Sequence, residues 1–254
     1  MSLFDNINTS KNANVANVAI DRNQNQQNVQ SFGFGNEDTY QQPLSSVDTN
    51  KLIRNTYLLL SMTLLFSAVT AGIAMLVNMP PMHFLVVIGG YLGLLFLTSY
   101  LKNSIWGLVS VFALTGFMGL TLGPIISLYL TIFSNGSQLV MMAFGSTAAI
   151  FLGLSGYALV SRKDFSFLGG FLFAGILIAF LAGLGAVIFQ LPGLSLAVSA
   201  MFVLLMAGLI LYQTSDMVHG RETNYIMATV TLYVSIYNLF LSLLQLFGAF
   251  MGEE

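Results

Sequence analysis

The sequence predicts an all-α integral membrane protein in which a bundle of seven transmembrane helices follows a polar N-terminal tail. Of the 254 residues, 56% are hydrophobic and only 7% are charged, whereas a soluble domain carries about 25% charged residues. After residue 50 the apolar residues form long runs, each near the roughly 20 residues that cross a bilayer. We therefore expect lipid to surround most of the chain.

The first 50 residues differ in composition from the rest of the chain. They contain ten Asn and six Gln and few large apolar side chains. Such a segment cannot bury enough apolar surface to offset the entropy lost on ordering. We predict that residues 1–50 are a disordered cytoplasmic tail and that residues 51–254 are the transmembrane domain.

Seven apolar runs are predicted to be the membrane spans. In chain order they are Thr56–Val77, Phe84–Leu101, Ile105–Phe133, Leu139–Val160, Phe165–Gln190, Leu194–Tyr212 and Tyr225–Met251. The third run is longer than a bilayer requires and contains Gly123-Pro124. Proline removes a helix hydrogen bond, so we expect a kink or a tilt in this span.

The basic residues predict the orientation of the bundle. If the N-terminus is cytoplasmic, seven crossings place all eight Lys and Arg on the cytoplasmic side, and the outer connections contain none. This distribution is the one that the positive-inside rule requires. Six aromatic residues also fall at the cytoplasmic ends of the spans, where amphipathic rings prefer the interface: Tyr57, Tyr100, Trp106, Tyr157, Tyr212 and Tyr225.

Polar side chains recur along one face of the last span. They are Thr231, Ser235, Asn238, Ser242 and Gln245, at spacings of four, three, four and three residues. Unsatisfied polar groups are costly in lipid, so this stripe is expected to face protein or a water-filled cavity. The seventh helix is therefore predicted to be central. The stripe is consistent with hydrogen bonding between helices and also with a permeation path.

Glycines inside the spans predict close contacts between helices. Gly116, Gly119 and Gly123 recur in the third span, and Gly169, Gly170 and Gly175 lie in the fifth. Small residues let helix backbones approach in lipid, where no hydrophobic effect drives association. Packing is the favoured interpretation of both sets.

One short motif suggests an enzyme. Gly153-Leu154-Ser155-Gly156 matches the G-x-S-G pattern of intramembrane serine proteases. Such a serine needs a histidine within hydrogen-bonding reach. The two histidines, His83 and His219, fall in a predicted outer turn and a predicted cytoplasmic loop. We therefore favour a packing role for Ser155 and expect no enzymatic activity.

Other ligands find little support in the residues. The chain has no cysteine and only two isolated histidines, so neither a metal site nor another cofactor is expected. A net charge of -2 gives no reason to expect a nucleic-acid partner. Asp216 lies near the end of the sixth span, where we expect it to be solvated or paired with Arg221, and a proton-sensing role is the alternative.

Several segments are similar to those of one known family of membrane proteins. They are Arg54-Asn55-Thr56-Tyr57, Thr115-Gly116-Phe117, Leu122-Gly123-Pro124-Ile125, Arg162-Lys163-Asp164-Phe165-Ser166-Phe167-Leu168-Gly169-Gly170, Glu222-Thr223-Asn224-Tyr225-Ile226 and Leu232-Tyr233-Val234-Ser235-Ile236-Tyr237-Asn238-Leu239-Phe240. In these residues the chain resembles the Bax inhibitor-1 family, and in particular its bacterial inner-membrane members. The resemblance covers roughly residues 51–250 and leaves out the tail.

The resemblance implies a seven-helix fold with the last helix at its centre, in a bacterial inner membrane. It also implies a function. Bacterial members are substrates and modulators of the membrane-anchored AAA protease FtsH, which grips an N-terminal cytoplasmic tail. Other members are pH-sensitive calcium leak channels, in which two membrane aspartates share a proton.

The chain departs from the channel-type members at both aspartates. The matching segments read Leu211-Tyr212-Gln213 and Leu232-Tyr233-Val234-Ser235. Gln213 and Ser235 can hydrogen-bond to each other, but neither titrates near neutral pH, so the coupled proton switch is lost. The resemblance therefore favours a modulator of FtsH that carries its tail as a handle. A calcium leak channel is the alternative, and an intramembrane serine protease is a third.

Overall fold

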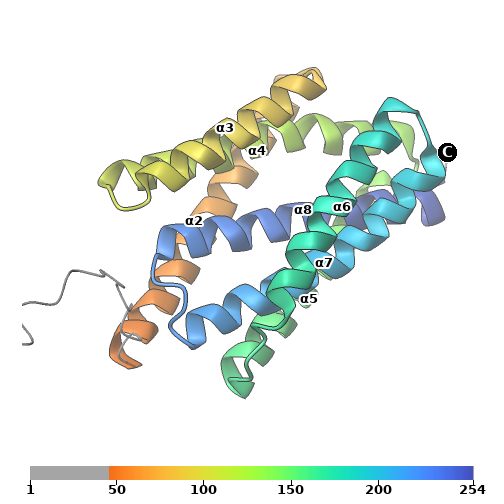
Figure 1. Ribbon diagram of the computed structural model, residues 1–254. Coiled ribbons are helices and arrows are strands. Elements are labelled where there is room, and N and C mark those ends of the chain that lie inside the picture. The colour runs from red at the N-terminus through yellow and green to blue at the C-terminus, as the bar shows by residue number, and fades with distance from the viewer. Residues whose placement is uncertain (1–45, 254) are drawn as a thin grey trace, which may run out of the picture. The chain divides into compact units, whose positions relative to one another are not determined.

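The computed structural model describes residues 46–253, which belong to one compact unit, Pro43–Glu254. These residues form seven helices joined by short turns, and no strand occurs among them (Figure 1). In chain order the helices are α2 (Ser46–Leu76), α3 (Phe84–Leu101), α4 (Ile105–Ile132), α5 (Gly136–Ser161), α6 (Leu168–Ile188), α7 (Pro192–Val218) and α8 (Tyr225–Met251). All seven are long and apolar enough to cross a membrane. The predicted all-α, seven-span fold is confirmed.

Helix ends agree with the hydropathy pattern at some places and extend beyond it at others. Both α3 and α8 have the predicted bounds, whereas α2 begins at Ser46 rather than Thr56, and α7 ends at Val218 rather than Tyr212. Hydropathy marks the part of a helix that lies in hydrocarbon, but backbone hydrogen bonds continue the helix into polar residues. Residues 46–50, predicted as tail, are thus the start of α2; the remainder of the predicted tail lies outside the described residues.

The two ends of the bundle differ in charge. At one end α2, α4, α6 and α8 begin and α3, α5 and α7 end, and we call it the basic end. The basic residues of the described chain gather there: Lys51, Arg54, Lys102, Arg162, Lys163 and Arg221. The opposite end carries the turns before α3, α5 and α7 and the residues after α8, and no Lys or Arg occurs there in residues 46–253.

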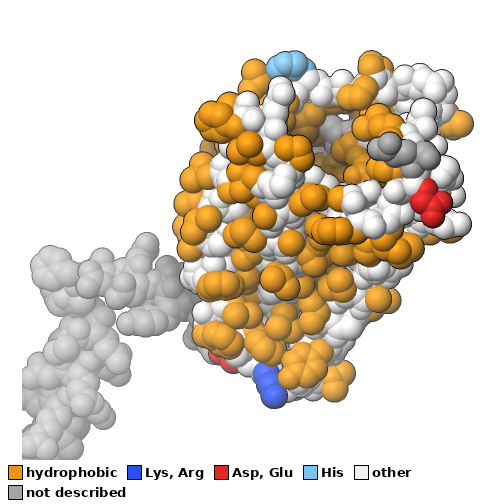
Figure 2. Space-filling view, turned by 90° about the vertical axis from the view of Figure 1, so that its right-hand side faces the viewer, with side chains coloured by type: hydrophobic (Ala, Val, Ile, Leu, Met, Phe, Trp, Pro, Cys, Tyr) orange, Lys and Arg blue, Asp and Glu red, His pale blue; other side chains and the backbone are white. Residues whose placement is uncertain are grey.

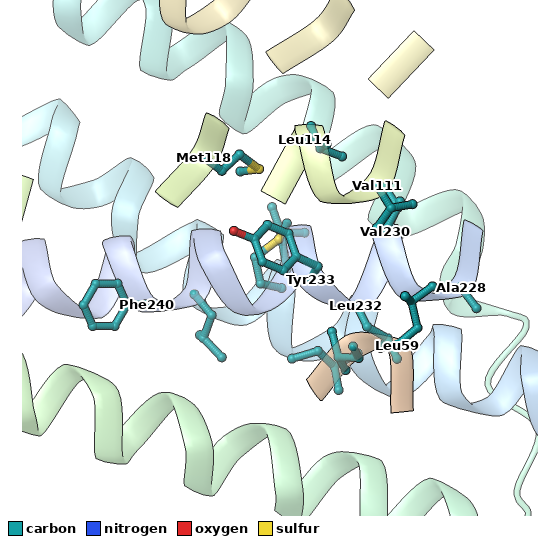
Figure 3. Close-up of a cluster of buried hydrophobic side chains, with 14 of the residues drawn as sticks. Leu59, Val111, Leu114, Met118, Ala228, Val230, Leu232, Tyr233 and Phe240 are labelled. Carbon is teal, nitrogen blue, oxygen red and sulfur yellow. The ribbon is translucent and has the colours of Figure 1, made fainter. Parts of the chain in front are cut away.

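The last helix, α8, lies inside the bundle. It packs against α7, α5, α2 and α4, and a larger share of it is buried than of any other described helix. Its side chains belong to a continuous apolar core, in which Tyr233 and Val230 lie on the side of Leu114 and Val111 of α4, and Leu232 lies beside Leu59 of α2 (Figure 3). By contrast, α3 packs mainly on α4. The central position predicted for the last helix agrees with this arrangement.

Both ends of α8 are bonded to the turns that flank α4. At the basic end, Asn224 caps α8 by accepting from Ile226 and Met227 N–H groups, and its amide donates to the Lys102 carbonyl at 3.0 Å. At the opposite end, the Asn135 amide donates to the Met251 carbonyl at 2.7 Å. These side-chain bonds satisfy helix-end groups that would otherwise lack partners.

Glycines bring α4 against α2, as predicted. A Cβ atom at Gly119 would meet the carbonyl oxygen of Ser67 and the hydroxyl of Thr70, and one at Gly123 would lie 2.6 Å from Cβ of Ala74. Glycine is the residue that lets these two backbones approach so closely. The fifth-span set is divided: a Cβ at Gly175 would meet Leu205 of α7, but one at Gly170 would meet nothing within 4 Å.

Candidate functional site

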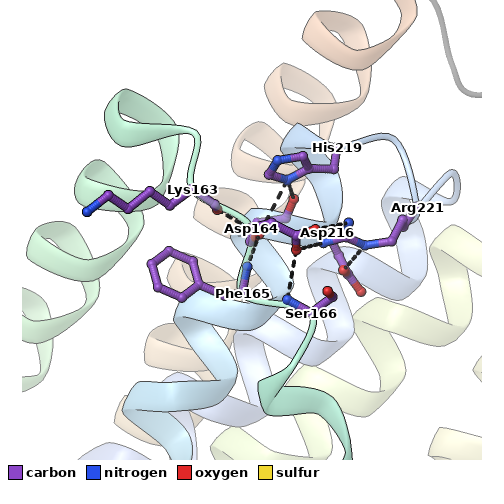
Figure 4. A network of polar contacts seen from close by, with 8 residues as sticks. Lys163, Asp164, Phe165, Ser166, Asp216, His219 and Arg221 are labelled. Atoms are coloured by element: carbon purple, nitrogen blue, oxygen red, sulfur yellow. Dashed lines mark hydrogen bonds and ion pairs between the residues drawn. The ribbon is translucent and has the colours of Figure 1, made fainter.

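A charged network closes the basic end of the bundle (Figure 4). Arg221, in the turn between α7 and α8, donates from Nη2 to Asp164 Oδ1 at 2.8 Å and from Nη1 to Asp164 Oδ2 at 3.1 Å. Its Nε donates to Asp216 Oδ1 at 2.7 Å. The planar guanidinium matches a carboxylate with two parallel bonds, which fixes geometry as well as charge. One side chain therefore joins the α5–α6 turn to α7.

Backbone hydrogen bonds hold the same turn against α7. The hydroxyl of Ser215 accepts from the Phe165 N–H at 3.1 Å and lies 3.2 Å from the Lys163 carbonyl, to which it donates. The Ser166 N–H donates to Asp164 Oδ1 at 2.8 Å. Nδ1 of His219 lies 2.8 Å from the Ser215 carbonyl oxygen. We name Asp164, Ser215, Asp216 and Arg221 the basic-end clasp.

The electrostatics of the clasp favour its charged form. The backbone N–H of Ser166 and the guanidinium of Arg221 lower the pKa of Asp164 to about 2. Burial lowers the pKa of Arg221, but its hydrogen bonds to Asp216 and Asp164 outweigh burial and raise it. Asp216 is thus paired with Arg221, as the sequence suggested, and its side chain is 14% exposed. A proton-sensing role for Asp216 stays a prediction.

A second group of polar side chains lies farther inside the bundle, and we name it the inner hydroxyl cluster. It joins Tyr57 of α2, Ser155 of α5 and Thr214 of α7. The Ser155 and Thr214 hydroxyl oxygens lie 3.1 Å apart, and the Tyr57 hydroxyl bonds to Ser155 and lies 3.4 Å from the Thr214 oxygen. Sequence reasoning missed this cluster, although all three residues lie near the basic ends of their spans.

The inner hydroxyl cluster argues against Ser155 as a nucleophile. Neither histidine is hydrogen-bonded to Ser155: His83 Nδ1 accepts from the Leu85 N–H, and His219 bonds to Ser215. Ser155 itself is buried and bonded to a tyrosine and a threonine, neither of which is a general base at neutral pH. The geometry thus fits the packing role that the sequence favoured.

Gln213 lies beside this cluster with an amide that lacks a partner. Its side chain is 5% exposed, and Nε2 forms no hydrogen bond. The hydrogen bond that the sequence permitted between Gln213 and Ser235 is not formed: Nε2 of Gln213 has no partner, and Ser235 donates to the Thr231 carbonyl of its own helix at 2.7 Å. The hydroxyl of Thr56 is likewise buried without a partner. Two polar groups near the basic end therefore remain unsatisfied by the described residues.

The polar stripe of α8 does not act as one unit. Ser235 and Asn238 bond to carbonyls of their own helix, the latter to Val234 at 2.8 Å. Only Gln245 is bonded to another helix: its Nε2 donates to Ser195 and its Oε1 accepts from Ser199, both at 2.6 Å. Of the remaining two, Ser242 is buried and Thr231 is half-buried.

Two tyrosines of α8 make further bonds between helices. The Tyr233 hydroxyl donates to the Thr115 carbonyl of α4 at 3.2 Å and lies 2.6 Å from the Ser67 hydroxyl of α2. The Tyr237 hydroxyl lies 2.9 Å from that of Thr121 in α4. Hydrogen bonding between helices, the first interpretation of the polar face, is therefore made largely by tyrosines beside the predicted stripe.

The fold and these sites define a polytopic membrane protein whose helices are joined by hydroxyl and amide contacts inside and by an ionic clasp at one end. No group of His, Asp or Glu that could hold a metal occurs among the described residues. The family model described as "Inhibitor of apoptosis-promoting Bax1" matches residues 49–252. The chain belongs to this family, the Bax inhibitor-1 family.

Individual relatives agree with this assignment. The chain is 47% identical over 204 residues to the Escherichia coli protein named "Modulator of FtsH protease YccA", covering 80% of this chain and 92% of that one. It is 53% identical over 207 residues to an uncharacterized protein of Pseudomonas aeruginosa, covering 82% and 93%. It is also 33% identical over 206 residues to mouse "Protein lifeguard 4", covering 78% and 84%.

Proposed function

We propose that this protein is a non-enzymatic modulator, and itself a substrate, of an FtsH-type AAA protease in a bacterial inner membrane. The observation that carries the proposal is the 47% identity to the E. coli modulator of FtsH, which extends over 92% of that chain. Two further observations support the proposal. The E. coli relative is named a modulator of a protease and not an enzyme, and the hydrogen bonds of Ser155 go to Tyr57 and Thr214 and not to a histidine.

The orientation follows from charge. The basic end carries every Lys and Arg of the described residues, so by the positive-inside rule it faces the cytoplasm. With seven spans, the N-terminus would then lie in the cytoplasm and Glu253 on the periplasmic side. Residues 1–45 would in this way be presented to the ATPase side of an FtsH-type protease, where they serve as its handle.

The first experiment tests this handle. Residues 2–45 are deleted, and the cellular half-life of the chain is followed after protein synthesis is stopped, with and without FtsH. We expect the deletion to lengthen the half-life only in cells that contain FtsH. A chain whose residues 2–45 are shuffled is the control for composition. An unchanged half-life of the deletion variant would refute the handle.

A second experiment tests modulation itself. The full chain is overproduced at several levels while the degradation of another FtsH membrane substrate is measured. A modulator that occupies the protease should slow that degradation in proportion to its own amount, because the effect is stoichiometric. If the other substrate disappears at the same rate at every level, the modulator proposal fails, whatever the result for the handle.

A calcium leak channel is the second candidate, favoured by membership of the Bax inhibitor-1 family. The residues at the two aspartate positions are Gln213 and Ser235, which do not titrate near neutral pH. The test is to measure calcium flux into liposomes that contain the purified protein and a calcium dye. A pH-dependent flux that Asp216→Asn abolishes would establish the channel; labelling of Ser155 by a serine-reactive probe would instead establish a hydrolase.

A further inference from the structure

A cavity of about 690 Å³ extends from the middle parts of α6, α7 and α8 toward the end of the bundle opposite the basic end, which it reaches along α3 and α4. Its walls come from α3, α4, α6, α7 and α8, and its rim includes Pro81 and Met82 just before α3. Figure 2 shows a hollow bordered by hydrophobic side chains on one face of the molecule. Neither the proposed role as a modulator of a protease nor the alternative role as a calcium leak channel accounts for such an apolar space.

The lining is apolar, and most of its polar members have partners. Thr121 donates to the Met118 carbonyl at 2.7 Å and lies 2.9 Å from the Tyr237 hydroxyl. The Asn238 amide donates to the Val234 carbonyl at 2.8 Å. A space that offers water few bonding partners stays dry and takes up apolar molecules instead. A molecule that occupies this cavity is therefore expected to be a hydrocarbon chain.

The cavity also has a wall through which lipid can enter. α3 packs mainly on α4, and α6 packs on α7, whereas no extensive contact joins α3 to α6 within residues 46–253. Leu92 of α3 is 50% exposed and Leu177 of α6 is 49% exposed, yet both line the cavity. The same side chains thus face the surrounding bilayer and the interior, which makes this wall a lateral opening.

The depth of the cavity identifies the part of the lipid that fits. On α4 the lining runs from Phe117 near the middle of the helix to Leu128 toward the opposite end. At 1.5 Å per residue this is about 16 Å, and half of a 30 Å hydrocarbon core is about 15 Å. We propose that the cavity holds one acyl chain of a phospholipid from the leaflet at that end, inserted between α3 and α6.

Photolabelling in nanodiscs tests this site directly. The probe is phosphatidylethanolamine with a diazirine on one acyl chain, and crosslinked residues are mapped by mass spectrometry. We expect labelling of Val234 and Leu241, which line the cavity from the enclosed helix α8. Labels confined to outward-facing residues such as Phe96, with none on α8, would overturn the proposal.

Cavity-filling variants have matched controls on the same helices. Ile176→Trp fills the cavity from α6, whereas Ile178→Trp, at a position 59% exposed, adds the same side chain on the outer surface. On α3 the pair is Val87→Trp and Val86→Trp, the latter at a position 55% exposed. The inward variants should reduce labelling of α8 severalfold and the outward ones should not. Equal labelling in both members of both pairs would refute the site.

A thiol test distinguishes lipid from water. The chain has no cysteine, so Val234→Cys is a unique thiol in the cavity, and Leu191→Cys in the α6–α7 turn is the exposed reference. In nanodiscs, a charged methanethiosulfonate should react with the thiol at position 191 and not with that at position 234, because a thiol in a dry apolar space stays protonated. Both thiols should react after unfolding in sodium dodecyl sulfate, which controls for thiol loss. Comparable reaction of the charged reagent at position 234 would show an aqueous cavity and overturn the proposal.

Discussion

Arg221 and Asp164 are 57 residues apart in the sequence, and they share two parallel hydrogen bonds of 2.8 and 3.1 Å. The same guanidinium bonds Asp216 at 2.7 Å. Because the three residues come from two turns and the end of α7, this one arginine connects the α5–α6 turn with the α7–α8 turn. Ion pairs therefore hold the segments of the basic end together, whereas apolar packing and hydrogen bonds of hydroxyl groups hold the helices together in the interior.

The first prediction concerns acid. The Ser166 N–H and Arg221 lower the pKa of Asp164 to about 2, from about 3.9 in an unfolded chain. A carboxyl group with a depressed pKa stabilises the folded state fully above the unfolded value, and that contribution is lost as the pH falls toward the folded value. The melting temperature in detergent should fall between about pH 4 and pH 2, and Asp164→Asn should flatten part of that fall.

The control for this prediction is Glu253→Gln. Glu253 is exposed at the opposite end of the bundle, and exposed carboxylates contribute little to stability. Its acid profile should match the unchanged chain. If the two variants alter the profile equally, Asp164 has no special role in the clasp.

The second prediction concerns the contact between α2 and α4. In Gly119→Ala the new methyl group meets Ser67 and Thr70, so we expect a loss of about 1–3 kcal/mol, as for an overpacked core. In Gly93→Ala nothing lies within 4 Å of the new methyl group, and the better helix former should be neutral or stabilising. Unfolding of both variants in mixed detergent measures the difference, and equal stabilities would contradict it.

The third prediction concerns Tyr233. Tyr233→Phe removes the bonds to the Thr115 carbonyl and the Ser67 hydroxyl but keeps the ring in the core. Bonds between helices in membranes contribute about 0.6 kcal/mol and at most about 1.7, so the loss should lie in that range. Tyr100→Phe, at a position 80% exposed, is the matched control and should change nothing. A Tyr233→Phe variant as stable as the control would show that these bonds contribute no stability.

The fourth prediction compares two glutamines. Nε2 of Gln213 is buried without a partner, so Gln213→Leu removes an unsatisfied group and should be neutral or stabilising. Gln245 is bonded to Ser195 and Ser199, so Gln245→Leu leaves two hydroxyls unpaired and should cost about 1–3 kcal/mol. The measurement is again unfolding in mixed detergent. Greater damage from Gln213→Leu would reverse the argument and indicate a bound partner for its amide.

The sequence predicts the spans well because crossing a bilayer imposes one simple requirement, a long apolar run. It also predicts the glycine contact of α4, because close packing of helices in lipid needs small residues. Side-chain partners are harder to predict. Tyr57 lies at the end of a span, where an interfacial aromatic residue is expected, yet its hydroxyl bonds to Ser155. Nothing local distinguishes these two outcomes, because the partner comes from a helix 98 residues away.

The polar stripe illustrates a second limit. Helical spacing correctly places Ser235, Asn238 and Gln245 along one helix, but it does not say whether each side chain bonds its own backbone or another helix. Serine and asparagine are short enough to reach a carbonyl of the preceding turn, as Ser235 and Asn238 do. Longer side chains reach farther, and Gln245 accordingly contacts α7.

The bonds at both ends of α8 affect how the chain leaves the membrane under force. Asn224 connects the start of α8 to the turn before α4, and Asn135 connects its end to the turn after α4. A motor that draws the chain from its N-terminus reaches α2, α3 and α4 in that order. Under the proposed extraction, withdrawal of α2 must first break its extensive packing on α4 and the bond from Ser67 to Tyr233. Resistance is therefore expected from the first helix onward, and withdrawal of α4 must then break both asparagine connections.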